Sequence, residues 1–287
     1  MSTTIAAISR GGRARKLVEA TSGAGISRRH LQIALGLAWL VDGAFQAQPF
    51  MFTRGFATQV IAPAAQGQPE FVSAPVDWAA SMIAAHPVAF NVPFAAVQLL
   101  LGVGLLVPRT ARAALAASIA WAVGVWYFGE GLSGLASGHA SLVTGAPGAG
   151  LLLALLAGAA WPTRHGSRVG PAPWLPLAWA VLWMGAAVLQ ALPQNSGKHH
   201  DVLLLSVLVA AEYVIGLGAL APRTRVPAAT LGLTMTLGFW ILGQHLGQLY
   251  SGQATDPNSG PLLALMAIAL MADRGRSSEE PGVARWP

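Results

Sequence analysis

The chain has 287 residues, of which 54% are hydrophobic and only 10% are charged, and its mean hydropathy is +0.55. Soluble domains carry about 25% charged residues, so this composition excludes an ordinary soluble protein and predicts an integral membrane protein. Cysteine is absent, which excludes disulfide bonds, thiolate metal sites and cysteine redox chemistry within this chain.

Apolar segments follow one another along the whole chain and predict an all-α, polytopic membrane helical bundle with about eight transmembrane helices. The fourth and eighth segments are shorter than the roughly 20 residues of a full span. The predicted spans are 31–50, 87–107, 113–134, 148–162, 174–193, 202–221, 227–249 and 261–272.

The net charge of +6 is not spread as in a nucleic-acid-binding protein. Most basic residues precede the first span, lie in every second connection after it, or follow the last span; the exceptions are Arg54 and Lys198. This positive-inside pattern predicts a multi-pass protein of the plasma membrane with both termini cytoplasmic. Its expected partner is the lipid bilayer and not nucleic acid.

Two stretches of the chain repeat one frame. WYFGEGLSGLASG at Trp126–Gly138 and WILGQHLGQLYSG at Trp240–Gly252 align at an offset of 114 residues. At the same offset Pro-Arg-Thr recurs at 108–110 and 222–224. The alignment predicts a tandem duplication of a four-helix unit. Because four spans return the chain to its starting side, both units enter the membrane in the same orientation, as parallel repeats do.

The first helices of the two units align at a different offset of 144 residues, which places an extracytoplasmic insertion at 51–85 in the first unit. Within it, 75–85 is predicted to form an amphipathic helix with Trp78 and Met82 on one face, as a lid or lipid-surface helix. The predicted domains are a basic cytoplasmic tail at 1–27, the first repeat at 28–165, the second repeat at 172–273 and a cytoplasmic tail at 274–287.

The passage AAEYVIGLGALAPRTRVPAATLGL at Ala210–Leu233 resembles the DoxX-like integral membrane proteins. The matching positions are Glu212, Gly216, Gly218 and Arg223. The opening helix, RRHLQIALGLAWLVDGAFQ at Arg28–Gln46, also resembles that family, whereas the first unit departs from it with Gln98 at the acidic position. The resemblance covers the first three helices of each unit. It implies a four-helix fold and an association with quinone-linked oxidoreductase systems.

Carboxylates inside predicted spans are expensive and are therefore candidates for chemistry. Glu212 lies near the middle of the sixth span, Glu130 near the outer end of the third, and Asp42 in the outer half of the first. These three are the candidate catalytic residues, as proton carriers or contacts of a quinone head group. A structural role, in which another helix satisfies each carboxyl group, is the alternative.

The third and seventh helices supply the candidate cofactor-binding residues Trp126, Trp240 and Gln244. Gln244 stands where the first unit has Glu130, and His245 stands where it has a glycine. This change predicts an asymmetric site, in which only one unit keeps the acid.

Several histidines and aspartates fall on the predicted outer side, where they form a polar cluster drawn from both units: His86, His139, His199, His200, His245, Asp201 and Asp256. Imidazole and carboxylate suit zinc, copper or iron, so His86, His200 and His245 are the candidate ligands of a divalent metal. No local His-x-x-x-His spacing supports the site, and capping of helix ends is the simpler role for these histidines.

Three functions remain open, and whether the chain is an enzyme remains open with them. A subunit for quinone-linked electron or proton transfer predicts a lipid-accessible cleft beside Glu212 or Glu130 and a redox partner protein. A transporter or metal-handling protein predicts a water-filled cavity lined by both units. A non-catalytic scaffold predicts tight packing without a cavity. The sequence does not set the oligomeric state.

Overall fold

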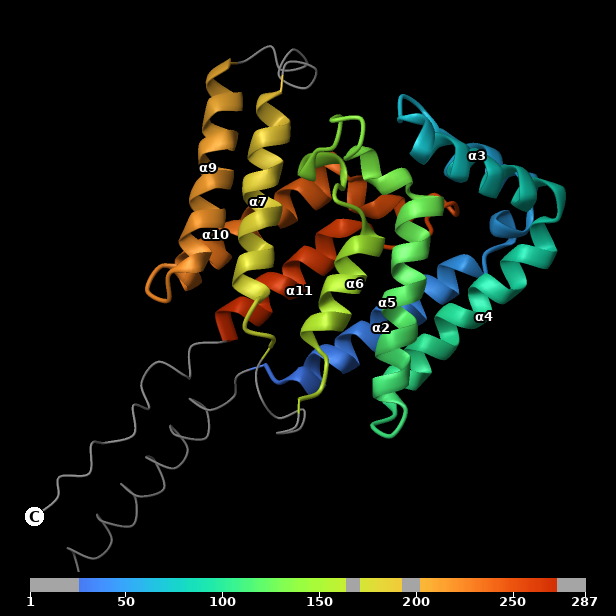
Figure 1. Cartoon of the computed structure of the whole chain (residues 1–287), viewed down its shortest axis with the longest axis horizontal. Coiled ribbons are helices and arrows are strands. Elements are labelled where there is room, and N and C mark those ends of the chain that lie inside the picture. The colour runs from blue at the N-terminus through green and yellow to red at the C-terminus, as the bar shows by residue number, and fades with distance from the viewer. Residues whose placement is uncertain (1–25, 164–170, 193–201, 273–287) are drawn as a thin grey trace, which may run out of the picture.

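The computed structural model describes residues 26–163, 171–192 and 202–272, and all of the regular elements within these ranges are helices (Figure 1). Each of the eight predicted spans overlaps one α-helix. In chain order they are α2 Arg28–Gln46, α4 Pro87–Leu106, α5 Ala111–Gly124, α6 Ala149–Ala159, α7 Leu175–Ala191, α9 Val202–Leu220, α10 Arg225–Gly238 and α11 Ser259–Met271.

Four helices are long and apolar enough to cross a membrane, and they are the second and third helices of each predicted unit. They comprise Pro87–Leu106, Ala111–Gly129, Val202–Leu220 and Arg225–Gly243. Leu100, Leu203 and Leu242 on these helices are more than two-thirds exposed, as expected of side chains that face lipid. The chain is thus a membrane protein. The helices α6, α7 and α11 are apolar but shorter.

Each half of the chain forms a ring of four helices with the same order of neighbours. In the first half α2 packs on α4, α4 on α5, α5 on α6, and α6 returns to α2. In the second half α7, α9, α10 and α11 pack in the same sequence, and α11 returns to α7. The two fourth helices, α6 and α11, lie side by side in the middle of the molecule (Figure 1).

Glycine allows the first and second helices of each ring to approach closely. A Cβ atom added to Gly102 would lie 2.8 Å from the carbonyl oxygen of Gly36, and one added to Gly216 would lie 3.1 Å from that of Ala180. Contacts this short exclude larger side chains, as in other tightly packed membrane helices. The same approach is therefore built into both halves.

Arginine side chains cap the carbonyl ends of the second helices. Arg29 donates to the Leu105 carbonyl oxygen at 2.8 Å, and Arg225 donates to the Ala219 carbonyl oxygen at 3.0 Å. Both contacts place a positive charge at a helix C-terminus, where the helix dipole favours it.

The third helices end earlier than predicted. Both α5 and α10 widen into a π-helical turn, at Val125–Gly129 and Phe239–Gly243. The backbone then turns left-handed, with φ of 54° at Leu132 and 56° at Leu246. The predicted spans 113–134 and 227–249 were therefore wrong at their outer ends, because a left-handed residue terminates an α-helix. π-Helical turns are frequent at functional sites.

The insertion forms a layer of short helical turns followed by α3, Glu70–Ala85. The predicted helix over 75–85 is confirmed and begins five residues earlier. Its buried face joins a small apolar cluster within the insertion: Met51, Phe56, Ala57, Ile61, Ala65, Val72, Val76, Ala80 and Ile83. The Tyr127 hydroxyl donates to the Phe71 carbonyl oxygen at 2.5 Å, which holds the insertion against the end of α5.

Candidate functional site

A cavity of about 750 Å³, here called cavity A, lies in the first half among α2, α3, α4 and α5. This volume is within the range of small-molecule sites. Its wall is largely apolar and includes seven aromatic side chains: Trp39, Phe56, Trp78, Phe90, Phe94, Trp121 and Phe128. The insertion supplies Phe56 and Trp78, so the segment that only the first half contains forms part of the cavity.

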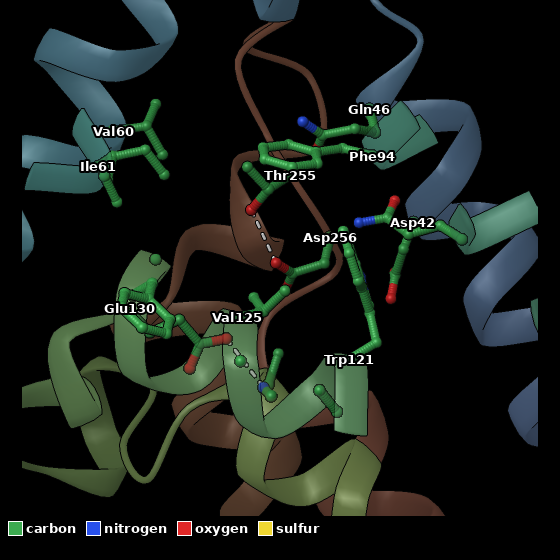
Figure 2. Close-up of a pocket in the computed structure, with 18 of the residues that line it drawn as sticks. Asp42, Gln46, Val60, Ile61, Phe94, Trp121, Val125, Glu130, Thr255 and Asp256 are labelled. Carbon is green, nitrogen blue, oxygen red and sulfur yellow. Dashed lines mark hydrogen bonds between the residues drawn. The ribbon is translucent and has the colours of Figure 1, made fainter. Parts of the chain in front are cut away.

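Three carboxylates from three separate segments face cavity A. Asp42 comes from α2, Glu130 directly follows the π-helical turn after α5, and Asp256 comes from the loop that precedes α11. Figure 2 shows Asp256 between the other two. The charge of Asp256 interacts unfavourably with that of Asp42 and with that of Glu130, so the three form one electrostatic group. We call them the acid trio.

The members of the acid trio differ in their hydrogen bonds. Glu130 accepts from the backbone N–H of Gly150 at 2.8 Å, in the first turn of α6, and from the Ser133 hydroxyl at 3.1 Å. Asp256 accepts from the Thr255 hydroxyl at 2.7 Å and from the Asn258 N–H at 2.6 Å. Asp42 is 5% exposed and accepts no hydrogen bond within the described residues. Its carboxylate is the one left open to a ligand.

Asp256 lies in the α10–α11 loop, outside the predicted spans. Burial raises the pKa of its carboxyl group above the ordinary value of 3.8, although the bonds from Thr255 and Asn258 act in the opposite direction. No lysine, arginine or histidine is among the described residues that line cavity A. Cavity A therefore favours protons and neutral or cationic ligands, and disfavours anions.

Amide side chains complete the polar part of cavity A. Gln46 and Asn91 are paired, since Gln46 donates to the Asn91 side chain and Asn91 Nδ2 donates back to the Gln46 carbonyl oxygen at 2.8 Å. The Oε1 atom of Gln98 is buried and has no hydrogen-bond partner. Gln98 and Asp42 thus offer unpaired polar groups to a molecule in cavity A.

A second cavity of about 510 Å³, here called cavity B, adjoins cavity A. Both cavities are lined by Val60, Glu130, Thr144, Ala149, Thr255, Asp256 and Asn258. Cavity B also includes polar side chains of both halves: Gln59, Ser133, Gln244, His245, Gln248 and Gln253. Glu130 and Asp256 therefore stand between an aromatic cavity and a polar one.

Gln244 occupies in the second half the structural place of Glu130. Gln244 Oε1 accepts from the N–H of Gly260, at the start of α11, at 3.2 Å. Its Nε2 donates to the Leu142 carbonyl oxygen at 3.1 Å. The amide can donate as well as accept, so it bridges the two halves, which a carboxylate could not do in the same way.

The candidate cofactor residues Trp126 and Trp240 are in equivalent contacts. Trp126 Nε1 donates to the Pro147 carbonyl oxygen at 2.7 Å, and Trp240 Nε1 donates to the Pro257 carbonyl oxygen at 2.8 Å. Neither tryptophan lines cavity A or cavity B. Of the three predicted cofactor residues, only Gln244 reaches a cavity, and it reaches cavity B.

Glu212 lies apart from the acid trio. It is fully buried in α9, both of its carboxylate oxygens lack a hydrogen-bond partner, and it lines neither cavity. The structure therefore brings together two of the predicted catalytic residues, Asp42 and Glu130, and separates the third.

The predicted metal ligands are not gathered at one place in the part of the chain that is described. His86 is exposed at the start of α4, and His245 is exposed at the edge of cavity B. Within the described ranges, no group of three histidine or carboxylate side chains is placed to hold a metal ion. His200 lies outside those ranges, so the metal site stays a prediction.

Asp256 was predicted only as a member of the outer polar cluster and was missed as a site residue. A signal was present: Asp256 precedes Pro257 as Ala146 precedes Pro147, and both prolines accept the tryptophan hydrogen bond. One loop therefore carries an acid where its counterpart carries alanine. Only the tertiary structure shows that this acid lines cavity A; there the second-half loop contacts the first half, as where Gln48 Nε2 donates to the Ala254 carbonyl oxygen at 3.1 Å.

Comparisons of the chain with protein-family models, with curated proteins and with solved structures find no match. The function is therefore argued from the two cavities and the acid trio.

Proposed function

We propose that this membrane protein binds the head group of a lipid-soluble carrier in cavity A and exchanges protons with it, as a subunit of a quinone-linked electron- or proton-transfer system. The observation that carries the proposal is the acid trio in an apolar cavity rich in aromatic side chains, which no basic residue of the described chain lines. The resemblance to DoxX-like proteins points in the same direction.

The chemistry of a quinone matches this lining. A quinone is flat and apolar apart from two carbonyl oxygens, which need hydrogen-bond donors. Aromatic side chains stack on such a ring, and a protonated carboxyl group is a donor. Asp256, whose pKa is raised by burial, is suited to hold and release that proton. In the proposed reaction the quinone takes two electrons from a redox partner protein and two protons through the acid trio, and leaves as quinol.

We also propose that all eight helices cross the membrane, as two four-helix repeats with both termini on the cytoplasmic side of the plasma membrane. The shared ring order and the paired contacts of Trp126 and Trp240 support the duplication. In this arrangement α6 and α11 are surrounded by other helices, so their short apolar lengths need not match the full lipid thickness.

A transporter of small cations is the second candidate, and one specific observation favours it. Cavity A is completed by a residue of the second half, Asp256, so a movement of one half against the other would alter the site. A scaffold function agrees less well with the molecule, because a scaffold has no need of a cavity lined by three carboxylates.

The proposal is tested by titrating the purified protein in detergent with a decyl-substituted quinone and following tryptophan fluorescence, since Trp39 and Trp121 line cavity A. We expect saturable quenching that decanol, the same chain without the head group, does not cause. The Asp42→Ala variant should bind about tenfold more weakly, because a hydrogen bond to an ionisable group contributes about 1.5–3 kcal/mol. Non-saturable quenching in the wild type would reject a quinone site. Competition by a lipophilic cation with no quinone effect would favour the transporter.

A further inference from the structure

Cavity A opens to the surface between apolar side chains, whereas cavity B opens between polar ones. Cavity A reaches the surface at Trp78, Met82 and Phe128, which are 60%, 38% and 41% exposed. Trp78 and Phe128 contact each other edge to face, with ring centroids 6.2 Å apart. An opening framed by apolar side chains beside a membrane helix faces lipid more favourably than water.

Cavity B reaches the surface at polar residues. His245, Gln248 and Gln253 are exposed, and all three line cavity B. The backbone around them is left-handed at several positions, including His245 and Gln248 with φ of 49° and 54°. Such turns leave the helix ladder and present backbone groups that need polar partners. This mouth is suited to water and unsuited to hydrocarbon.

Between the two mouths stand Glu130 and Asp256, which line both cavities. Ser133 lines cavity B and donates to Glu130 at 3.1 Å. Behind them, on the side of cavity A, Asp42 is buried and has no hydrogen-bond partner in the described chain. A polar route thus leads from the outer surface to carboxylates that the aromatic cavity also contacts.

We propose that cavity B is a water-filled vestibule through which protons pass between the extracytoplasmic solution and the carboxylates of Glu130 and Asp256, while the ligand enters cavity A from the lipid. The titratable groups that face this pair are Asp42 across cavity A and His245 at the mouth of cavity B. The vestibule does not depend on the identity of the ligand, so it stands or falls separately from the quinone proposal.

The absence of cysteine from the chain allows a direct test, because single-cysteine variants have no background. We would introduce Ser133→Cys inside cavity B, Gln253→Cys at its mouth and Ser118→Cys as a control. Ser118 is fully buried and accepts from Trp39 Nε1 at 2.6 Å. The variants would be treated in intact cells with a cationic, membrane-impermeant methanethiosulfonate. Cysteines at 133 and 253 should react at least tenfold faster than the control.

Thr144→Cys provides a second position if Ser133→Cys does not accumulate, because Thr144 is exposed and lines both cavities. Reaction at 253 without reaction at 133 or 144 would show that the mouth is not continuous with the acid trio and would overturn the vestibule. So would reaction only after the cells are opened, since that would place cavity B on the cytoplasmic side.

A second measurement addresses the protons themselves. The infrared band of protonated carboxyl groups shifts on transfer to deuterium oxide, and its rate of shift reports solvent access. We expect the reagent bound at Ser133→Cys to slow that shift at least tenfold. An unchanged rate after labelling would contradict the vestibule. If the protein binds quinone but Ser133→Cys does not react with the reagent, the vestibule alone is overturned. If Ser133→Cys reacts but the protein does not bind quinone, the quinone site alone is overturned.

Discussion

The first and second halves of the molecule share a ring of four helices but not the same interior. Two of the three carboxylates that face cavity A, Asp42 and Glu130, belong to the first half, and their aligned positions in the second half hold no acid. Asp42 aligns with Ala186 and Glu130 with Gln244. The third carboxylate, Asp256, comes from the second-half loop, whose first-half counterpart carries Ala146 before the matching proline. The helix contacts of the predicted repeat are thus similar in the two halves, whereas carboxylates of both halves are gathered at cavity A on the first-half side.

The second half also holds an acid at a predicted catalytic position where the first half has none. Glu212 of the second half aligns with Gln98 of the first. Gln98 faces cavity A, whereas Glu212 is enclosed without a hydrogen-bond partner. A buried carboxyl group therefore need not mark the site. What distinguishes the acid trio is that its carboxylates line one shared cavity.

The largest expected effect comes from replacing the two first-half carboxylates of the acid trio by the residues at the aligned second-half positions. The double variant Asp42→Ala, Glu130→Gln removes two of the acid trio and should weaken binding of the decyl-substituted quinone at least a hundredfold, about 3 kcal/mol. Fluorescence titration measures it. Glu212→Gln is the control and should change the affinity by less than twofold. An equal loss in the control would show that the two halves do not differ in the proposed way.

The next effect concerns the loop that positions Glu130. Gly148 has φ of 100°, and a Cβ atom there would collide with the Glu130 carboxylate and the Ser133 hydroxyl. Gly148→Ala should lower the free energy of unfolding by about 1–3 kcal/mol and weaken quinone binding. Gly67 has φ of 69° and no atom within 4 Å of an added Cβ, so Gly67→Ala measures the backbone cost alone. If Gly148→Ala and Gly67→Ala lose the same free energy of unfolding, the structure accommodates the added Cβ at 148 without strain.

In the second half, Glu212→Leu should raise the free energy of unfolding by about 1–3 kcal/mol, because an unpaired buried polar group is costly. Thermal unfolding in detergent measures the change. Gln98→Leu is the matched first-half variant and should weaken ligand binding, because Gln98 faces cavity A. Destabilisation by Glu212→Leu would reveal a partner for the carboxyl group and restore Glu212 as a candidate for chemistry.

The smallest expected effect is a pH dependence of stability. Burial raises the pKa of Asp256 above 3.8, so the folded state binds this proton more tightly than the unfolded state. Its contribution to stability is fully present below about pH 4 and is lost as the pH rises through the raised pKa. The wild-type unfolding midpoint should therefore fall more steeply with pH than that of Asp256→Asn. Parallel curves for the wild type and Asp256→Asn would contradict this contribution of Asp256.

Much of the helical plan was predictable from local patterns. The apolar segments contain the helices, and the insertion contains the helix with Trp78 and Met82. The outer ends of the third helices were not predictable, because the left-handed turns at Leu132 and Leu246 place residues other than glycine in a conformation that L-residues rarely adopt. Packing of the loops against those turns, such as Ala64 against Gly131, overrides the local preference.

The sequence by itself determined that this is a helical membrane protein, since hydrophobicity and its spacing along the chain decide whether a segment is helical and apolar. It also singled out Asp42 and Glu130. Only the tertiary structure decided that these two meet Asp256 and that Glu212 does not join them. The three carboxylates lie on segments of the chain that are separated by more than 80 residues. Packing of the helix rings and loops brings these segments together, and no local pattern in the sequence encodes those contacts.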